Sequence, residues 1–384
     1  MLKKISDSIR HIRLWVCGLV ALVILTAVDI GVRRLENIPG LMIRNEGRST
    51  QALPYMFARM DRTPSPRIVW LGASVMQGVN AATPQTTAPV VSEKLLRAQN
   101  IPATCFNTAT IGNNFGDNLA IFTESLRHKP DLFVYAINIV IFSNQSIFGK
   151  MCLQRNLAYY LRKEPDFLSL CQNNIEMGPS EWRRIFVDMS ISRVWAFYRY
   201  SGLIRYVLTG KGEDMGEIFE DFFSDALGIK EKRATRMLRN ILHDYKDRED
   251  LWKDLPDNFY LTKQGMFSDL DLDPNGVHCR TLDRLCKAAK KSGKKILFFF
   301  NPMNMEVLDK FGLLEPEKMS QFKKVVLSLT GKYGFDSFDA TTMIPPKYFV
   351  DEIHLSIRGH QELAKILAPE IERELRLQNE GSLK

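Results

Sequence analysis

The sequence is short of the residue clusters that bind transition metals. It has six cysteines and six histidines among 384 residues, and it contains neither a C-x-x-C pair nor an H-E-x-x-H pair. Protein zinc sites are built on close spacings of this kind, which place two ligands on one turn or one helix face. The sequence therefore predicts no metal centre, and we expect no cofactor.

The cysteines also provide no clear disulfide framework. Cys17 lies in an apolar run, which leaves five cysteines, an odd number, for the rest of the chain. Cys152 and Cys171 are a candidate pair if the domain folds in an oxidising compartment. Two buried free thiols are an equally open alternative.

A large basic surface is missing as well. The net charge is +8, but residues 1–34 hold six basic and two acidic side chains, so half of the excess flanks one apolar run. The remaining chain has no stripe of basic residues interleaved with aromatics, which is the usual signature of nucleic-acid binding. We therefore expect no nucleic-acid partner.

One long apolar run is present, over residues 14–32 between Arg13 and Arg33. As a helix with a rise of about 1.5 Å per residue, it would span about 28 Å, close to the ~30 Å hydrocarbon core of a bilayer. This predicts a transmembrane anchor after a cytoplasmic tail of residues 1–13, with a cleaved signal peptide as the alternative. Basic residues flank both ends equally, but a short tail is easily retained while a long domain is translocated regardless of charge. We expect an extracytoplasmic domain.

An alternation of strands and helices begins after a tether predicted over residues 33–66. Continuous apolar runs, typical of strands buried on both faces, are separated by helical segments. The alternation stops in a long charged stretch at about 146–290 and then resumes. This predicts one α/β domain over 67–375, with a parallel sheet and a large helical insertion, before a tail over 376–384. The predicted strands are Ile68–Leu71, Ala103–Asn107, Leu132–Ile137, Lys295–Asn301 and Gly334–Phe338, and the predicted helices are Ala88–Gln99, Asp117–Arg127, Pro316–Tyr333 and Ser356–Leu375.

A serine follows the first predicted strand, in Gly72-Ala73-Ser74. A sharp turn at the carboxyl edge of a parallel strand exposes the serine hydroxyl and places it near backbone N–H groups. Ser74 is therefore a candidate nucleophile. The alternative is a serine that only shapes a loop or caps a helix.

A complementary pair comes immediately before the last helix, as Asp351-Glu-Ile-His354. A serine nucleophile needs a base, and the imidazole needs an acceptor on its second nitrogen. An aspartate three residues before the histidine can supply that acceptor within one bent turn. We therefore predict His354 as the base and Asp351 as its orienting group, against the alternative of a loop carboxylate beside a surface histidine.

Two more candidates follow the second and third predicted strands. Gly112 lies in a turn rich in glycine and asparagine, and its N–H can face an oxyanion. Asn138 can present its side-chain amide to the same point. Turn formation is the alternative role for both residues.

The serine follows the first strand, the glycine the second and the asparagine the third, and D-x-x-H comes before the last helix. In this order of motifs the sequence resembles the SGNH (GDSL-like) hydrolases. It is most similar to membrane-anchored members tied to cell-envelope polysaccharides. The resemblance implies a flavodoxin-like parallel sheet with helices on both faces. Two blocks depart from the family pattern. The usual G-D-S is Gly72-Ala73-Ser74, and the usual G-x-N-D is replaced by Ala136-Ile137-Asn138-Ile139, which makes Asn144 an alternative oxyanion donor.

The resemblance also implies the chemistry. It points to a serine esterase or an O-acyltransferase that acts on acyl esters, chiefly acetyl esters, of an extracytoplasmic glycan. The expected partners are an acylated glycan or another small ester, and the membrane. A catalytically silent scaffold or glycan-binding component of an envelope polysaccharide assembly is the alternative, and a lipase-like enzyme facing the cytoplasm is a third possibility.

Overall fold

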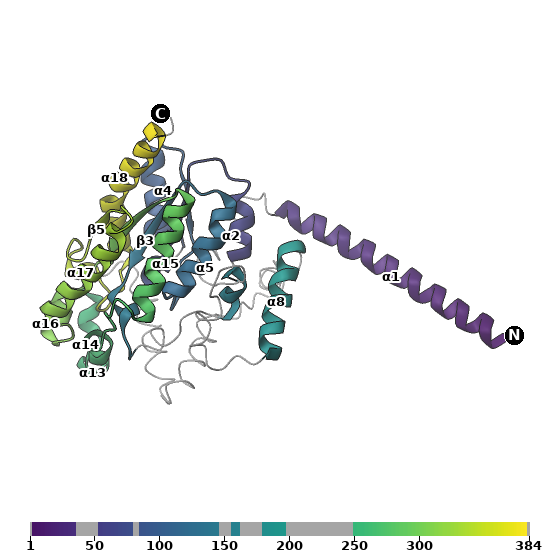
Figure 1. The fold of residues 1–384 in the computed structure, drawn as a ribbon, viewed down its shortest axis with the longest axis horizontal. Coiled ribbons are helices and arrows are strands. Elements are labelled where there is room, and N and C mark those ends of the chain that lie inside the picture. Colours follow the sequence, from purple (N-terminus) through teal and green to yellow (C-terminus); the bar gives the residue numbers. More distant parts are fainter. Residues whose placement is uncertain are drawn as a thin grey trace.

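The computed structural model describes residues 2–35, 53–79, 84–145, 155–161, 179–196 and 249–381. Five parallel strands form one sheet in the order β2-β1-β3-β4-β5, the flavodoxin-like order (Figure 1). The strands are β1 (Arg67–Leu71), β2 (Thr104–Asn107), β3 (Leu132–Ile137), β4 (Lys295–Phe300) and β5 (Ser337–Asp339). The predicted α/β class and parallel sheet are confirmed.

Apolar runs become strands here because helices cover both faces of the sheet. All six residues of β3, in the middle of the sheet, are buried, whereas β5 at the edge has no buried residue. Right-handed crossovers place helices on one face when the chain steps from β1 to β2, and on the other face when it steps the opposite way. Accordingly α4 packs against α18, whereas α15 packs against α5 and α17. These helices are α4 (Ala88–Ala98), α5 (Phe115–Ser125), α15 (Val277–Ser292), α17 (Pro316–Gly331) and α18 (Ile357–Gly381).

The remaining elements connect this framework. The α-helices among them are α2 (Leu53–Met60), α3 (Ser74–Gln77), α8 (Pro179–Val194), α13 (Asp257–Leu261), α14 (Gln264–Ser268) and α16 (Met305–Lys310). The 3-10 turns are η2 (Pro84–Thr86), η3 (Leu126–His128), η4 (Ile139–Phe142), η5 (Arg155–Leu161), η6 (Leu251–Asp254) and η7 (Pro346–Tyr348).

Two helices lie in segments for which the sequence predicted another role. Helix α2 lies within the predicted tether, and its residues Leu53, Met56, Phe57 and Met60 are buried in the core. Their spacing of three, one and three residues places them on one helix face, a pattern too short to stand out in the sequence. Helix α15 lies within the predicted insertion but serves as the crossover before β4. Cys152 and Cys171 lie outside the described residues.

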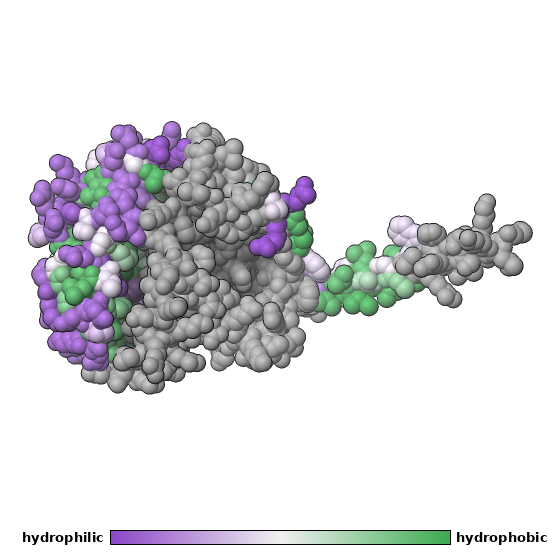
Figure 2. Space-filling view, turned by 90° about the horizontal axis from the view of Figure 1, so that it is seen from below, coloured by the Kyte–Doolittle hydropathy of each residue, from purple (hydrophilic) through white to green (hydrophobic). Residues whose placement is uncertain are grey.

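The predicted anchor, residues 14–32, lies in helix α1 (Leu2–Leu35), which projects from the domain in Figure 1. Apolar side chains along it, from Trp15 to Ile30, are exposed, as Figure 2 shows. Of the helices in the described ranges, none combines the length and the apolar character needed to cross a membrane.

The burial of α2 leads to a test of where the folded domain begins. We expect Met56→Ala to lower the free energy of unfolding by about 2–5 kcal/mol, because it empties a fully buried site. Urea unfolding of the full chain measures this. The control is Leu327→Ala, because the Leu327 side chain is 47% exposed. We expect it to change the free energy of unfolding by less than about 0.5 kcal/mol. If Met56→Ala is as silent as the control, α2 is not part of the core.

Candidate active site

The turn that carries Ser74 depends on glycine. Gly72 has φ +152°, and a Cβ atom there would lie 3.1 Å from the Met76 Cγ atom and 3.3 Å from the Ala136 Cβ atom. Ala73 is extended, and α3 begins at Ser74 itself. The chain therefore reverses within two residues, which leaves Ser74 partly exposed at the carboxyl edge of the sheet.

Side chains from neighbouring elements hold this turn. The Gly72 N–H donates to Asn118 Oδ1 at 2.9 Å, and the Asn118 amide donates to the Asn114 carbonyl at 2.8 Å. From the end of β2, the Asn107 amide donates to the Met76 carbonyl at 2.7 Å. These supporting residues were not among those predicted from the sequence. The Asn114–Asp117 capping box at the start of α5 was the available signal for the first of them.

The loop that carries Asp351 and His354 is closed by its own backbone. Val350 N–H donates to the His354 carbonyl at 2.8 Å, and Ser356 N–H donates to the Tyr348 carbonyl at 2.9 Å. We call residues 348–356 the catalytic loop. Inside it, Asp351 Oδ1 accepts the N–H groups of Ile353 at 2.9 Å and of His354 at 2.7 Å. These bonds explain why a spacing of three residues brings the carboxylate beside the ring.

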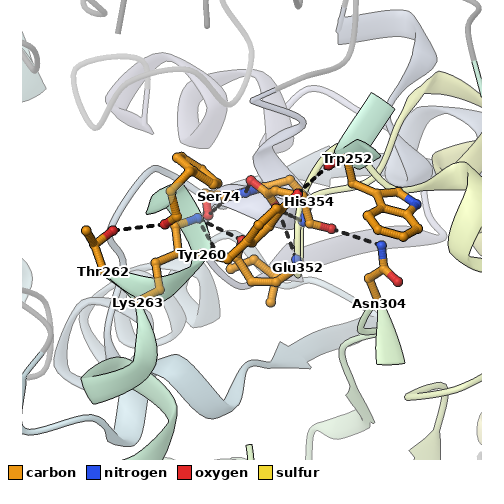
Figure 3. A network of polar contacts seen from close by, with 11 residues as sticks. Ser74, Trp252, Tyr260, Thr262, Lys263, Asn304, Glu352 and His354 are labelled. Atoms are coloured by element: carbon orange, nitrogen blue, oxygen red, sulfur yellow. Dashed lines mark hydrogen bonds and ion pairs between the residues drawn. The ribbon is translucent and has the colours of Figure 1, made fainter. Parts of the chain in front are cut away.

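The structure brings the three predicted catalytic residues into one line. Ser74 Oγ lies 2.8 Å from His354 Nε2, although 280 residues separate them in the sequence. On the other side of the ring, His354 Nδ1 lies 2.7 Å from Asp351 Oδ2. Figure 3 shows Ser74 and His354 facing each other in a wider polar network. The predicted meeting of serine and histidine at the carboxyl edge of the sheet is confirmed.

The charges around the ring favour the imidazolium form. Burial lowers the pKa of His354, but the Asp351 and Glu352 carboxylates raise it more, so the pKa lies above its ordinary value. Burial alone would raise the pKa of Asp351, yet His354 and Lys263 hold it well below its usual range. Asp351 therefore remains ionised and accepts the Nδ1 proton. Above the pKa of His354 the ring is neutral, and Nε2 is then free to accept the serine proton.

The two predicted oxyanion donors occupy the expected positions along the sheet. Gly112, with φ +71°, is buried in the turn after β2, and Asn138 follows β3. Because β2 and β3 both neighbour β1, these residues lie on either side of the strand that leads to Ser74. The Asn138 carbonyl oxygen Oδ1 accepts the Val140 N–H at 3.1 Å and so caps η4.

The proposed substitute, Asn144, is engaged elsewhere. Its side-chain amide donates to Asp269 Oδ1 at 2.9 Å, and Gln145 donates to the second carboxylate oxygen at 3.1 Å. One donor of the Asn144 amide is therefore occupied by Asp269, and its role as an alternative oxyanion donor stays a prediction. The described residues also contain no group of three or more acidic, histidine or cysteine side chains that could hold a metal ion.

Comparisons with known proteins add little to this picture. No protein-family model and no curated protein matches the sequence. Similar solved structures include an alpha/beta hydrolase enzyme from the metagenome of Lake Arreo, Spain, with 11% identity, a TM-score of 0.37, and coverage of 80% of this chain and 96% of that one. Another is an acetylxylan esterase from Geobacillus stearothermophilus, with 12% identity, a TM-score of 0.38, and coverage of 81% and 94%. Because TM-scores this low do not establish a shared fold, these similarities assign no activity to the chain.

The charges around His354 lead to a pH prediction. A protonated imidazole cannot accept the serine proton, so the reaction of Ser74 with a serine-directed phosphonate should rise with pH, with a midpoint above pH 6.5. Asp351→Asn removes the charge that stabilises the imidazolium. We expect it to move the midpoint to lower pH and to slow the reaction about 10²–10⁴-fold. A pH–rate profile measures both. An unchanged midpoint in this variant would contradict the assignment of Asp351.

Proposed function

We propose that the chain is an SGNH-like serine esterase or O-acyltransferase, anchored to a membrane, that acts on acyl esters, chiefly acetyl esters, of an extracytoplasmic glycan. One observation carries the catalytic part. Ser74, His354 and Asp351 form a continuous hydrogen-bonded line, with contacts of 2.8 Å and 2.7 Å. Such a line activates a serine hydroxyl for acyl transfer. The glycan and the acetyl group rest on the sequence resemblance.

In the first half-reaction Ser74 Oγ would attack the acyl carbon, and its proton would pass to His354 Nε2. The bond between the acyl carbon and the substrate alcohol then breaks, and the alcohol leaves with that proton. The acyl group remains on Ser74 as an ester. In the second half-reaction water or a sugar hydroxyl attacks this ester, again with His354 as the base, so hydrolase and transferase share one intermediate.

The tetrahedral intermediate would need donors for its oxyanion. The backbone N–H groups of Ser74 and Gly112 are suitable because both residues lie in turns at the carboxyl edge of neighbouring strands. Asn138 is the third proposed donor. The bond from Val140 to Asn138 Oδ1 fixes the direction of this side chain, so that Nδ2 is the end left to face a ligand.

One observation favours the alternative of a silent scaffold. The block that carries Asn138, Ala136-Ile137-Asn138-Ile139, departs from the G-x-N-D pattern of the family that the sequence resembles. Without its amide the oxyanion would have only two backbone donors, and loss of one donor typically slows turnover about 10²–10³-fold. Inertness of the folded native chain toward esters and phosphonates would establish this alternative.

The nucleophile assignment predicts the behaviour of a single substitution. We expect the native chain to release acetate from a small activated ester and to be labelled covalently by the phosphonate. Ser74→Ala should abolish both while leaving the fold intact, because it removes only the Oγ atom. Ser328→Ala, on the exposed side of α17, is the control and should behave as the native chain. Mass spectrometry locates the label. Persistent labelling of Ser74→Ala would place the nucleophile elsewhere.

The location of the domain is proposed from the sequence alone, since none of the helices in the described ranges meets the length and apolar character of a membrane span. The apolar run at 14–32 and the short basic tail before it favour an anchor that leaves the domain outside the cytoplasm. Protease added to intact spheroplasts should therefore digest the domain. Protection until the membrane is permeabilised would overturn this location and, with it, the glycan substrate class.

A further inference from the structure

The segment that follows the long charged stretch contacts the catalytic loop. We call residues 249–271 the arm. It contains η6, α13 and α14, and its Trp252, Tyr260 and Phe267 side chains are buried in the core. The Tyr260 ring stacks on Phe311 with centroids 4.6 Å apart, and its hydroxyl donates to the Trp252 carbonyl at 2.7 Å. The arm is therefore packed into the hydrophobic core through side chains other than those that contact the catalytic loop.

The arm is joined to both halves of the candidate site. At its start the Asp250 N–H donates to the Lys347 carbonyl at 2.8 Å, next to the catalytic loop. At its end the Asp271 N–H donates to the Phe142 carbonyl at 2.7 Å, in the turn that follows Asn138. The same segment thus contacts the loop that carries the base and the turn after β3 that carries a proposed oxyanion donor.

The closest charged contact between arm and loop is a buried ion pair. Lys263 Nζ lies 2.6 Å and 2.8 Å from the two carboxylate oxygens of Glu352, the residue after Asp351 (Figure 3). The Glu352 side chain is only 2% exposed and that of Lys263 is 18% exposed. The ammonium also lies 3.9 Å from the Phe259 ring centroid. A pair with this little solvent is costly to desolvate, and replacing it with apolar residues is often neutral or stabilising. Overall stability alone does not explain it.

We propose that Lys263, through Glu352, positions the catalytic loop so that Asp351 and His354 are held in line with Ser74. This rests on the proposed function and adds a positioning pair to it. The backbone of Glu352 is fixed as well, because its carbonyl accepts the Asn304 N–H at 3.0 Å. Lys263 thus holds the side chain of Glu352 and Asn304 holds its main chain. In the sequence Glu352 lies between the two catalytic residues of the loop.

The pair also sets the charge that the ring faces. Glu352 raises the pKa of His354 and Lys263 lowers it, so each charge of the pair offsets part of the effect of the other. Burial lowers the pKa of His360, also close to His354, to about 3, which leaves that ring neutral in the working range. Among the described residues, the groups that act on His354 are Asp351 and Glu352 on its own loop, Lys263 on the arm, His360 on α18 and the Ser74 hydroxyl on α3. Tyr260 on the arm faces the Asp351 and Glu352 carboxylates.

The test compares pH–rate profiles of phosphonate labelling in full-length variants. Glu352→Gln keeps the shape of the side chain but leaves the ring facing an unbalanced Lys263. We expect the midpoint to fall by about one pH unit or more. In Lys263→Met/Glu352→Gln both charges are gone, so the midpoint should shift back toward the native value. The plateau rate should stay at least about tenfold lower, because the ion pair that holds the catalytic loop to the arm is lost. A purely structural role would not restore the midpoint.

Lys310→Met is the matched control. Lys310 pairs with Asp257 of the arm at 3.7 Å, but both side chains are more than half exposed, so midpoint and plateau should match the native chain. Circular dichroism melts identify variants that do not fold. If Glu352→Gln unfolds, the double variant decides, since it leaves no unpaired charge. A native midpoint and plateau in the double variant would overturn the proposal, whereas a native chain that is never labelled would instead overturn the proposed function.

Discussion

The hydrogen bond between Ser74 Oγ and His354 Nε2 depends on two backbone features that the fold must deliver together. One is the sharp turn at Gly72, which places the serine at the carboxyl edge of β1. The other is the catalytic loop, closed on itself before α18. Neither feature has a catalytic use alone. Helix α4 follows the serine turn, and α18 follows the catalytic loop. Because α18 packs on α4, Ser74 Oγ and His354 Nε2 lie 2.8 Å apart.

Sequence patterns predicted this arrangement where the governing rule is local or topological. The residues of β3 are buried along the whole strand, so a continuous apolar run gave its bounds correctly. The Asp351–His354 pairing is local, since backbone N–H groups within the loop hold the carboxylate. The Ser74–His354 contact is distant in sequence, but parallel strands end at one edge of a sheet, and this rule sufficed to predict it.

Other features escaped prediction because they depend on partners that no pattern marks. Lys263 and Glu352 are 89 residues apart, and nothing in either stretch distinguishes their pair from exposed charges. Asn144 follows β3 as an oxyanion donor might, yet its amide binds Asp269, on the arm, 125 residues away. Helix α2 is only eight residues long, so its buried face did not rise above the surrounding polar sequence. Tertiary contacts, rather than local propensity, decide all three.

A crystal structure of the phosphonate adduct tests the central claim most directly, since it locates both the nucleophile and the oxyanion. We predict a bond from Ser74 Oγ to phosphorus, with a phosphoryl oxygen about 2.7–3.1 Å from the backbone nitrogens of Ser74 and Gly112. His354 should stay within hydrogen-bond reach of the adduct. A phosphorus atom bonded to any other residue, or a phosphoryl oxygen turned away from both nitrogens, would contradict the account.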